Sequence, residues 1–102
     1  MKNSRASERY AKSLLQLSID KDLVEEIKSD IDMLIIIFSE SREVSNLYLS
    51  PIIPIHHKVE ITNKIFSKKI NENTLNLILN VIYRKRDNLI QSILSKFIEL
   101  YN

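Results

Sequence analysis

The side chains best suited to chemistry are few in this sequence, and their spacing does not suit metal binding. The two histidines, His56 and His57, are adjacent. Neighbouring residues on a helix point about 100° apart, so these two rings cannot hold one metal ion without ligands from elsewhere. The simplest interpretation is two exposed residues in the first turn of a helix, with no metal bound.

Two pairs of carboxylates lie close together, Glu25 with Glu26 and Asp30 with Asp32. A carboxylate pair can supply a general acid and a general base. Here lysines are interspersed with the acids, which is typical of a solvated helix face. No serine is spaced from a histidine and an aspartate as a nucleophilic triad would suggest. We therefore expect no catalytic residues.

Composition excludes further classes of site. The 102 residues include no cysteine, which rules out disulfides, thiolate zinc sites and thiol nucleophiles. They include no glycine, which rules out glycine-rich phosphate loops and the nucleophile elbow of the α/β-hydrolases. With 44% hydrophobic and 27% charged residues, the chain has the composition of one globular domain. These observations favour a protein that is not an enzyme and binds no cofactor.

Arg84, Lys85 and Arg86 form the one basic cluster, next to Tyr83. Such a cluster can contact RNA or phosphate. It is also typical of a helix C-terminus, where cations interact favourably with the helix dipole. The formal net charge is only +2, which does not indicate a dedicated nucleic-acid-binding protein.

The elements that must position these residues are all predicted to be helices. Apolar residues recur at spacings of three and four along nearly the whole chain. Pro51 and Pro54 divide it into two helical halves, and Pro54 starts the second. We expect an all-α six-helix bundle in a single domain. The predicted helices run from about Ala6 to Ile19, from Asp22 to Phe38, from Ser41 through Tyr48, from Ile55 to Phe66, from Asn71 or Asn73 through Ile82, and from Leu89 to Tyr101.

Several residues are candidates for helix ends. Asn3 or Ser4 lies near the start of the first helix, and Asp22 has Glu25 in capping-box spacing for the second. Asp87 is a candidate cap for the last helix. Because glycine is absent, left-handed positions after helices must be filled by Asn, Lys or other residues at some cost in strain.

Two of the predicted helices carry more apolar surface than one core face requires. The helix that follows Asn71 is apolar on most sides, and the first helix has a second apolar stripe formed by Tyr10, Leu14 and Leu17. A helix that is apolar all round is either central or has one face reserved for a partner. Two interpretations follow: a central fifth helix, or a groove that accepts an amphipathic helix.

No segment predicts a membrane span or a secretory signal. The longest apolar run, from Met33 to Phe38, is far shorter than the roughly 20 residues that a span requires. The first residues contain no apolar signal region. We expect a soluble cytoplasmic protein, or one held on a membrane complex by protein contacts.

Five segments of the chain occur together in one order. They are Ser7–Leu15 with its Arg-Tyr-Ala stretch, Leu49–Pro54 followed by Lys58, Thr74–Leu79, Arg86 with Leu89, and Phe97–Asn102. In this order they resemble the δ subunit of bacterial rotary ATP synthases, whose mitochondrial counterpart is the oligomycin-sensitivity-conferring protein. The family pattern has a glycine where Lys85 stands and a small residue where Ser13 stands.

The resemblance implies a six-helix N-terminal domain over residues 1–102, at the top of the catalytic head. In the family, a groove between the first and fifth helices receives the N-terminal helix of an α subunit. A second, C-terminal domain contacts the b subunit of the peripheral stalk, and we expect that domain to be absent here. Carried onto this chain, the partner-helix site comprises Tyr10, Ser13, Leu14, Leu17, Leu75, Ile78, Leu79 and Ile82.

The resulting hypothesis is a non-catalytic stator adaptor at the cytoplasmic face of the bacterial inner membrane, associated with the membrane only through the complex. It predicts that Tyr10→Ala or Ile78→Asp weakens helix binding without unfolding the chain. The alternative is a small all-α RNA-binding regulator of the antitermination-factor type. The residues that would contact RNA are Arg5, Arg9, Arg84, Lys85 and Arg86.

Overall fold

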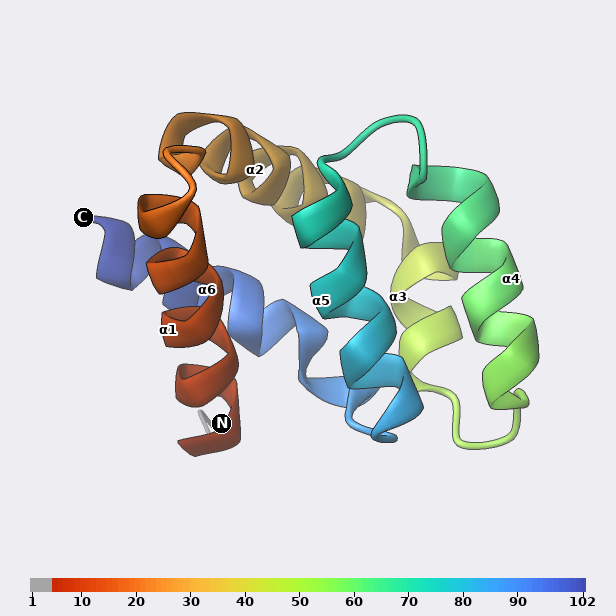
Figure 1. The fold of residues 1–102 in the computed structure, drawn as a ribbon. Coiled ribbons are helices and arrows are strands. Elements are labelled where there is room, and N and C mark those ends of the chain that lie inside the picture. Colours follow the sequence, from red (N-terminus) through yellow and green to blue (C-terminus); the bar gives the residue numbers. More distant parts are fainter. Residues whose placement is uncertain (1–4) are drawn as a thin grey trace.

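Within residues 5–102, apolar residues at helical spacing form six α-helices joined by short turns (Figure 1). A computed structural model describes residues 5–102, so the predicted cap at Asn3 or Ser4 lies outside the described residues. The all-α prediction is confirmed, and no strand occurs within the described part of the chain. The elements are α1 (Arg5–Asp20), α2 (Val24–Glu40), α3 (Arg42–Leu49), α4 (Ile55–Phe66), α5 (Glu72–Tyr83), a 3₁₀ turn η1 (Asp87–Leu89) and α6 (Ile90–Tyr101).

Polar side chains begin α3 and α5 as predicted. The Ser41 hydroxyl accepts a hydrogen bond from the Val44 backbone N–H at 3.2 Å. Asn71, not Asn73, caps α5, and its side-chain oxygen accepts from the Asn73 N–H at 2.8 Å. Each bond satisfies one backbone donor that the first helical turn leaves free.

The predicted cap at Asp22 is wrong. Asp22 has φ 59° and lies in the turn that closes α1, whereas the residue before α2 is Leu23, which makes no side-chain cap. The Asp22 N–H donates to the Ile19 carbonyl at 3.1 Å, and the Leu23 N–H donates to the Ser18 carbonyl at 2.7 Å. This pair of bonds is a Schellman motif, which needs a left-handed residue at that position.

The predicted cap at Asp87 is also wrong. Asp87 lies in η1 and is buried, and its carboxylate accepts a hydrogen bond from the Lys58 ammonium at 2.5 Å. The residue before α6 is Leu89, which makes no side-chain cap. An ionised carboxylate that is this buried needs a cationic partner more than a helix needs a cap.

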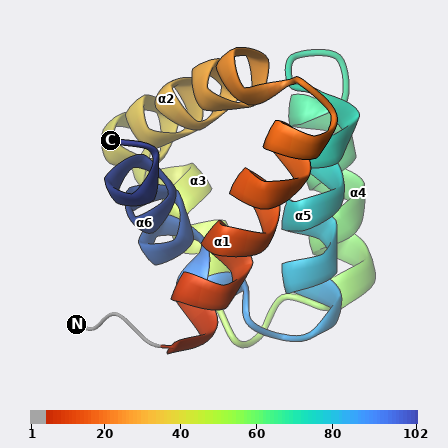
Figure 2. The ribbon, with the colours of Figure 1, turned by 60° about the vertical axis from the view of Figure 1, so that its left-hand side comes forward.

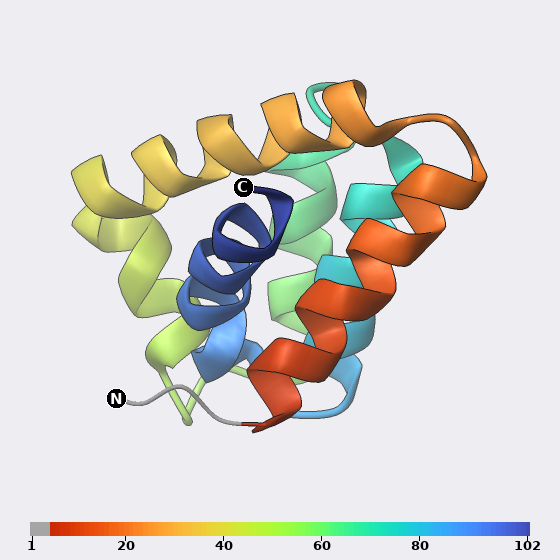
Figure 3. The same ribbon diagram turned by 90° about the vertical axis from the view of Figure 1, so that its left-hand side faces the viewer.

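The helices surround one core, with α6 in contact with both α1 and α2 (Figure 3). On the other side, α5 lies between α1 and α4 (Figures 1 and 2). Large side chains that are fully buried fill the interior. They include Ile27, Ile31, Leu34, Phe66, Ile82, Ile93, Leu94 and Phe97.

A buried carboxylate on α2 fixes the start of α5. Asp30 Oδ2 accepts hydrogen bonds from the Asn71 backbone N–H and from the Thr74 hydroxyl, both at 2.8 Å. At the same end of α5, the Lys21 ammonium donates to Asn73 Oδ1 at 3.4 Å. The end of α1 and the start of α5 are therefore neighbours, and the two helices run antiparallel.

Candidate functional site

Helix α1 presents one flank to α6 and the other to α5. Leu15 and Ile19 line a shallow depression together with Leu100 of α6, so their flank faces α6. Tyr10 and Leu17 lie on the opposite flank, roughly 150° around the helix. Since α1 lies between α6 and α5 (Figure 2), that opposite flank faces α5. Of the residues predicted on α1, Tyr10 and Leu17 are half-buried, and Ser13, next to them toward solvent, is exposed and also borders the depression.

Helix α5 also has two flanks. Asn73 contacts Lys21 at the end of α1, and Leu77 lies beside Ile90 and Ile93 of α6. Asn80 follows at the same helical spacing, so Asn73, Leu77 and Asn80 form the stripe on the α1 side. We define the α1–α5 surface by its α1 members, Tyr10, Ser13 and Leu17, and its α5 members, Asn73, Leu77 and Asn80.

The structure corrects most of the predicted site on α5. Ile78 and Ile82 are 2% and 0% exposed, so they belong to the core and cannot touch a partner. Leu75 and Leu79 are half-buried and lie roughly 160° around the helix from Leu77. Because α5 packs between α1 and α4, the flank opposite α1 is the one toward α4. The excess apolar surface of α5 arises because the helix packs on both sides, which fits the alternative of a central helix.

The placement of Leu14 in the predicted partner-helix site is corrected in the same way. It is 3% exposed and packs in the core beside Ala11, so it does not line a surface. The expectation that Ile78→Asp leaves the fold intact fails for the same reason, because a buried charge without a partner destabilises a core. Sequence reasoning missed Asn73, Leu77 and Asn80, although their i, i+4, i+7 spacing was a usable signal.

Residues 6–102 match the family model described as "ATP synthase delta (OSCP) subunit". The chain belongs to this family. The family that the five segments resemble is therefore confirmed. Within residues 5–102, no helix is both long and apolar enough to cross a membrane.

Relatives within this family come from several bacteria. The chain is 36% identical over 92 residues to ATP synthase subunit delta of Prochlorococcus marinus (strain MIT 9301), covering 90% of this chain and 51% of the relative. It is 31% identical over 100 residues to that of Chlorobaculum parvum, covering 98% and 55%. For Fusobacterium nucleatum the identity is 28% over 101 residues, covering 99% and 58%. The chain thus spans about half the length of these relatives.

Lys85 stands where the delta-family pattern has a glycine, and it keeps the backbone conformation that glycine would adopt. Its φ angle is 61°. Its N–H bonds the Ile82 carbonyl and the Arg86 N–H bonds the Val81 carbonyl, both at 2.9 Å. These bonds close α5 with a second Schellman motif. The turn therefore keeps its geometry at the cost of strain in a residue that carries a Cβ atom.

The predicted RNA-contacting residues gather at one end of the bundle. The start of α1 and the turn after α5 both lie at that end (Figures 1 and 2). Arg5, Arg9 and the three residues Arg84–Arg86 are all exposed, and none forms an ion pair with another described residue. The nearby acidic side chains of Glu8 and Asp87 are instead paired with lysines.

Of the residues considered for chemistry, the two aspartates make structural contacts and the two histidines lie on the surface. His56 is exposed, and His57 is exposed with Nδ1 4.0 Å from Glu60. Asp30 holds the start of α5, and Asp32 pairs with Lys28 at 2.7 Å. No group of three or more potential metal ligands comes together within residues 5–102.

Proposed function

We propose that this chain is a non-catalytic adaptor in the stator of a rotary ATP synthase, in which the α1–α5 surface binds the N-terminal helix of an α subunit. Membership of the delta family supports the assignment of this chain to an ATP synthase complex. The observation that supports the site is the pairing of two antiparallel helices whose facing flanks keep apolar side chains partly exposed.

The composition of the α1–α5 surface suits an amphipathic helix. Tyr10, Leu17 and Leu77 are half-buried and offer apolar contact, while Ser13, Asn73 and Asn80 offer hydrogen-bonding groups beside them. A helix laid between α1 and α5 would bury its apolar face on the first group and its polar edges on the second. An aromatic residue near the centre of such a contact commonly contributes more than its neighbours, which makes Tyr10 the anchor.

A stator adaptor has to resist torque without catalysing anything. The rotating central stalk drags on the catalytic head, and the drag does useful work only if the head is held still. Binding an α-subunit helix would connect this domain firmly to the head. We propose that residues 1–102 form the N-terminal domain and that contact with the b subunit belongs to the part of the relatives that this chain does not span. Attachment to the cytoplasmic face of the bacterial inner membrane would then be indirect.

Binding of a synthetic peptide with the first ~25 residues of the cognate α subunit, long enough for several helical turns, tests this proposal. Tyr10→Ala should weaken binding about tenfold, since it removes a central anchor. Ser13→Arg should weaken it as much, because an exposed small residue is replaced by one that blocks the flank.

Ile19→Arg is the matched control, since Ile19 is 53% exposed on the other flank of α1. It should leave the dissociation constant from calorimetric titration unchanged. Circular dichroism checks that each variant is folded. Equal weakening by Ile19→Arg and Ser13→Arg would place the partner elsewhere on α1, and no effect of Tyr10→Ala or Ser13→Arg would exclude this surface.

A further inference from the structure

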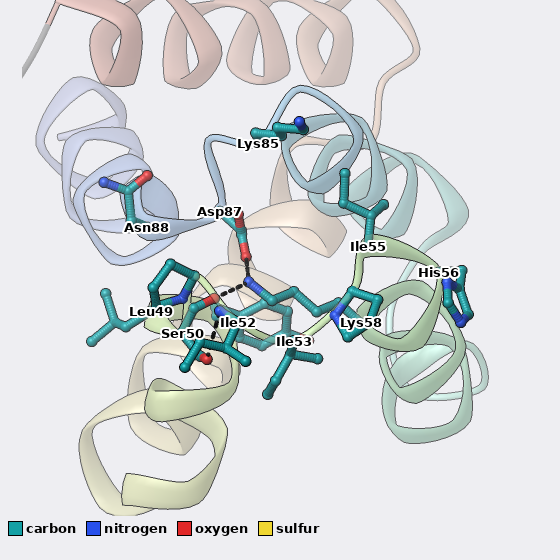
Figure 4. A pocket seen from close by; sticks show the side chains of 13 residues that line it. Leu49, Ser50, Ile52, Ile53, Ile55, His56, Lys58, Lys85, Asp87 and Asn88 are labelled. Carbon is teal, nitrogen blue, oxygen red and sulfur yellow. Dashed lines mark hydrogen bonds and ion pairs between the residues drawn. The ribbon is translucent and has the colours of Figure 1, made fainter.

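A cavity of about 640 Å³ that shares no lining residue with the α1–α5 surface opens between the α3–α4 link and the turn after α5 (Figure 4). The link supplies apolar side chains on one side, and the turn supplies polar and charged side chains on the other. We define the link groove by the residues of this cavity that matter most here: Leu49, Ile52, Ile53, Lys58, Lys85 and Asp87.

The apolar side of the link groove is unusually open to solvent. Ile52 is 86% exposed and Leu49 is 53% exposed, whereas the core isoleucines of this chain are almost fully buried. Pro51 and Pro54 restrict the backbone on either side of Ile52, and the Ser50 hydroxyl accepts a hydrogen bond from the Ile52 N–H at 3.2 Å. The link is therefore held in one shape, which lowers the entropy that a partner must overcome.

An ion pair forms the floor of the link groove. Lys58 Nζ donates to Asp87 Oδ2 at 2.5 Å and to the Ser50 carbonyl at 2.7 Å (Figure 4). The two side chains are only 6% and 10% exposed. An ammonium has three N–H donors, so one remains for an acceptor in the cavity. A carboxylate there would be repelled by Asp87, and a neutral carbonyl oxygen would not.

The rim of the link groove is positively charged. Lys85 lines the cavity and is exposed, with Arg84 and Arg86 on either side. None of the three forms an ion pair with another described residue, and Asp87 is already neutralised by Lys58. An acidic side chain of a partner would therefore be attracted to Lys85 without competition.

We propose that the link groove binds an extended, acidic and apolar segment of a partner protein. Its apolar side chains cover Leu49 and Ile52, a backbone carbonyl accepts from Lys58, and an acidic side chain pairs with Lys85. Nucleic acid fits less well, because the most exposed apolar residues here, Leu49 and Ile52, are aliphatic, whereas bases stack on aromatic faces. This site shares no residue with the α1–α5 surface and goes beyond the proposed function.

The test is an NMR titration of the isotopically labelled chain with terminally blocked pentapeptides. The probe alternates apolar and acidic residues, Leu-Glu-Ile-Glu-Leu. Two matched peptides replace both glutamates by lysine or all three apolar residues by serine. We expect saturable shifts at millimolar probe, confined to residues 49–58 and 84–88, and much weaker shifts with either matched peptide. Because the two sites are separate, the α-subunit peptide should bind unchanged in the presence of the probe.

Variants separate the apolar contact from the charge. Ile52→Ser should weaken binding of the probe about tenfold and Lys85→Glu about fivefold. The matched controls are Ile36→Ser, on α2 and 54% exposed, and Lys68→Glu, at an exposed position just after α4; neither should change binding.

Three results would overturn the proposal: no saturable shifts with the probe, equal binding of the lysine peptide, or shifts that map to the α1–α5 surface instead. Binding of a single-stranded oligonucleotide to the link groove, more tightly than the probe, would also overturn it in favour of nucleic acid. None of these results decides the assignment of the α1–α5 surface, which is tested separately by the titration with the α-subunit peptide.

Discussion

At the scale of single residues, the chain places side chains where most sequences would place glycine. Asp22 and Lys85 have φ values of 59° and 61°, and each completes a Schellman motif at the end of a helix. A residue with a Cβ atom pays roughly 1–2 kcal/mol for this conformation. Aspartate tolerates it better than lysine, because its short polar side chain can hydrogen-bond locally.

Lys85→Gly should therefore raise the free energy of unfolding by about 0.5–1 kcal/mol, after allowing for the greater freedom of glycine in the unfolded chain. Asp22→Gly should raise it less. Arg84→Gly is the matched control, because Arg84 has φ −87° and glycine relieves no strain there; it should lower stability. Urea unfolding measures all three, and a lower stability for Lys85→Gly than for wild type would contradict the strain.

Tyr48 is a second residue whose environment sets its chemistry. It is 2% exposed, stacks on Phe38 and bonds the Thr62 hydroxyl at 2.7 Å. Thr62 itself bonds the Lys58 carbonyl at 2.7 Å, so Tyr48 is the donor to Thr62. Burial raises the pKa of Tyr48 above its ordinary value of 10.0, and the negative charge of Asp87 adds to the shift.

A raised pKa in the folded state means that the unfolded chain loses this proton first. The contribution of Tyr48 to stability is therefore complete below pH 10.0 and is lost as the pH rises through the folded pKa. Tyr48→Phe should cost about 1 kcal/mol at neutral pH, for one hydrogen bond, and the variant should lose less stability than wild type above pH 10.0. If the free energies of unfolding of the two proteins, measured in urea, fell in parallel as the pH rose, Tyr48 would not be the cause of the loss of stability at alkaline pH.

At the scale of elements, the buried pair of Lys58 and Asp87 joins parts of the chain that are distant in sequence. Lys58 is on α4, Asp87 is in η1, and the same ammonium holds the Ser50 carbonyl at the end of α3. The α3–α4 link and the turn after α5 are held together by these two bonds. They therefore fix the shape of the link groove.

Lys58→Met should destabilise the chain by about 3–5 kcal/mol, because it leaves the Asp87 carboxylate buried without a partner. The double variant Lys58→Met with Asp87→Leu should recover much of that loss, since it removes the second charge as well. The measurement is a double-mutant cycle by urea unfolding. A double variant as unstable as the sum of the two single variants would contradict the coupling.

The elements were mostly predictable because their signals are local. The apolar spacing and the caps at Ser41 and Asn71 depend on residues within one helical turn. The failures at Asp22 and Asp87 have different causes. Aspartate is a residue type that often caps helices, but Asp22 instead adopts the left-handed conformation that closes α1. Asp87 is recruited by Lys58, which is 29 positions away and cannot be seen in a local pattern.

The candidate site was predictable in part for the same reason. Helical spacing singled out two helices, α1 and α5, that the structure places side by side, and on α1 the flank that carries Tyr10 and Leu17. On α5 the pattern was ambiguous, because α1, α2 and α4 all pack around it and each needs apolar contact. Ile78 and Ile82 face the core for that reason, while the half-buried Leu77 with its two asparagines remained unrecognised.

At the scale of the whole molecule, the two proposed surfaces lie on different parts of the bundle. The α1–α5 surface runs along two antiparallel helices, and the link groove lies at the end where α3, α4 and α5 meet (Figures 1 and 4). Two separate contacts would resist rotation of the domain better than one. This arrangement would suit the proposed stator adaptor, because torque can turn a body about a single attachment.

The central claim is that the α1–α5 surface receives an α-subunit helix, and paramagnetic NMR tests it most directly. The labelled chain is titrated with the α-subunit N-terminal peptide carrying a spin label at one end, and line broadening is mapped along the chain. The account predicts saturable shifts along Tyr10–Leu17 and Asn73–Asn80, with broadening at one end of that surface that moves to the other end when the label is moved. Shifts that map to the α4 flank of α5 at Leu75 and Leu79, or the absence of shifts in a folded monomer, would contradict it.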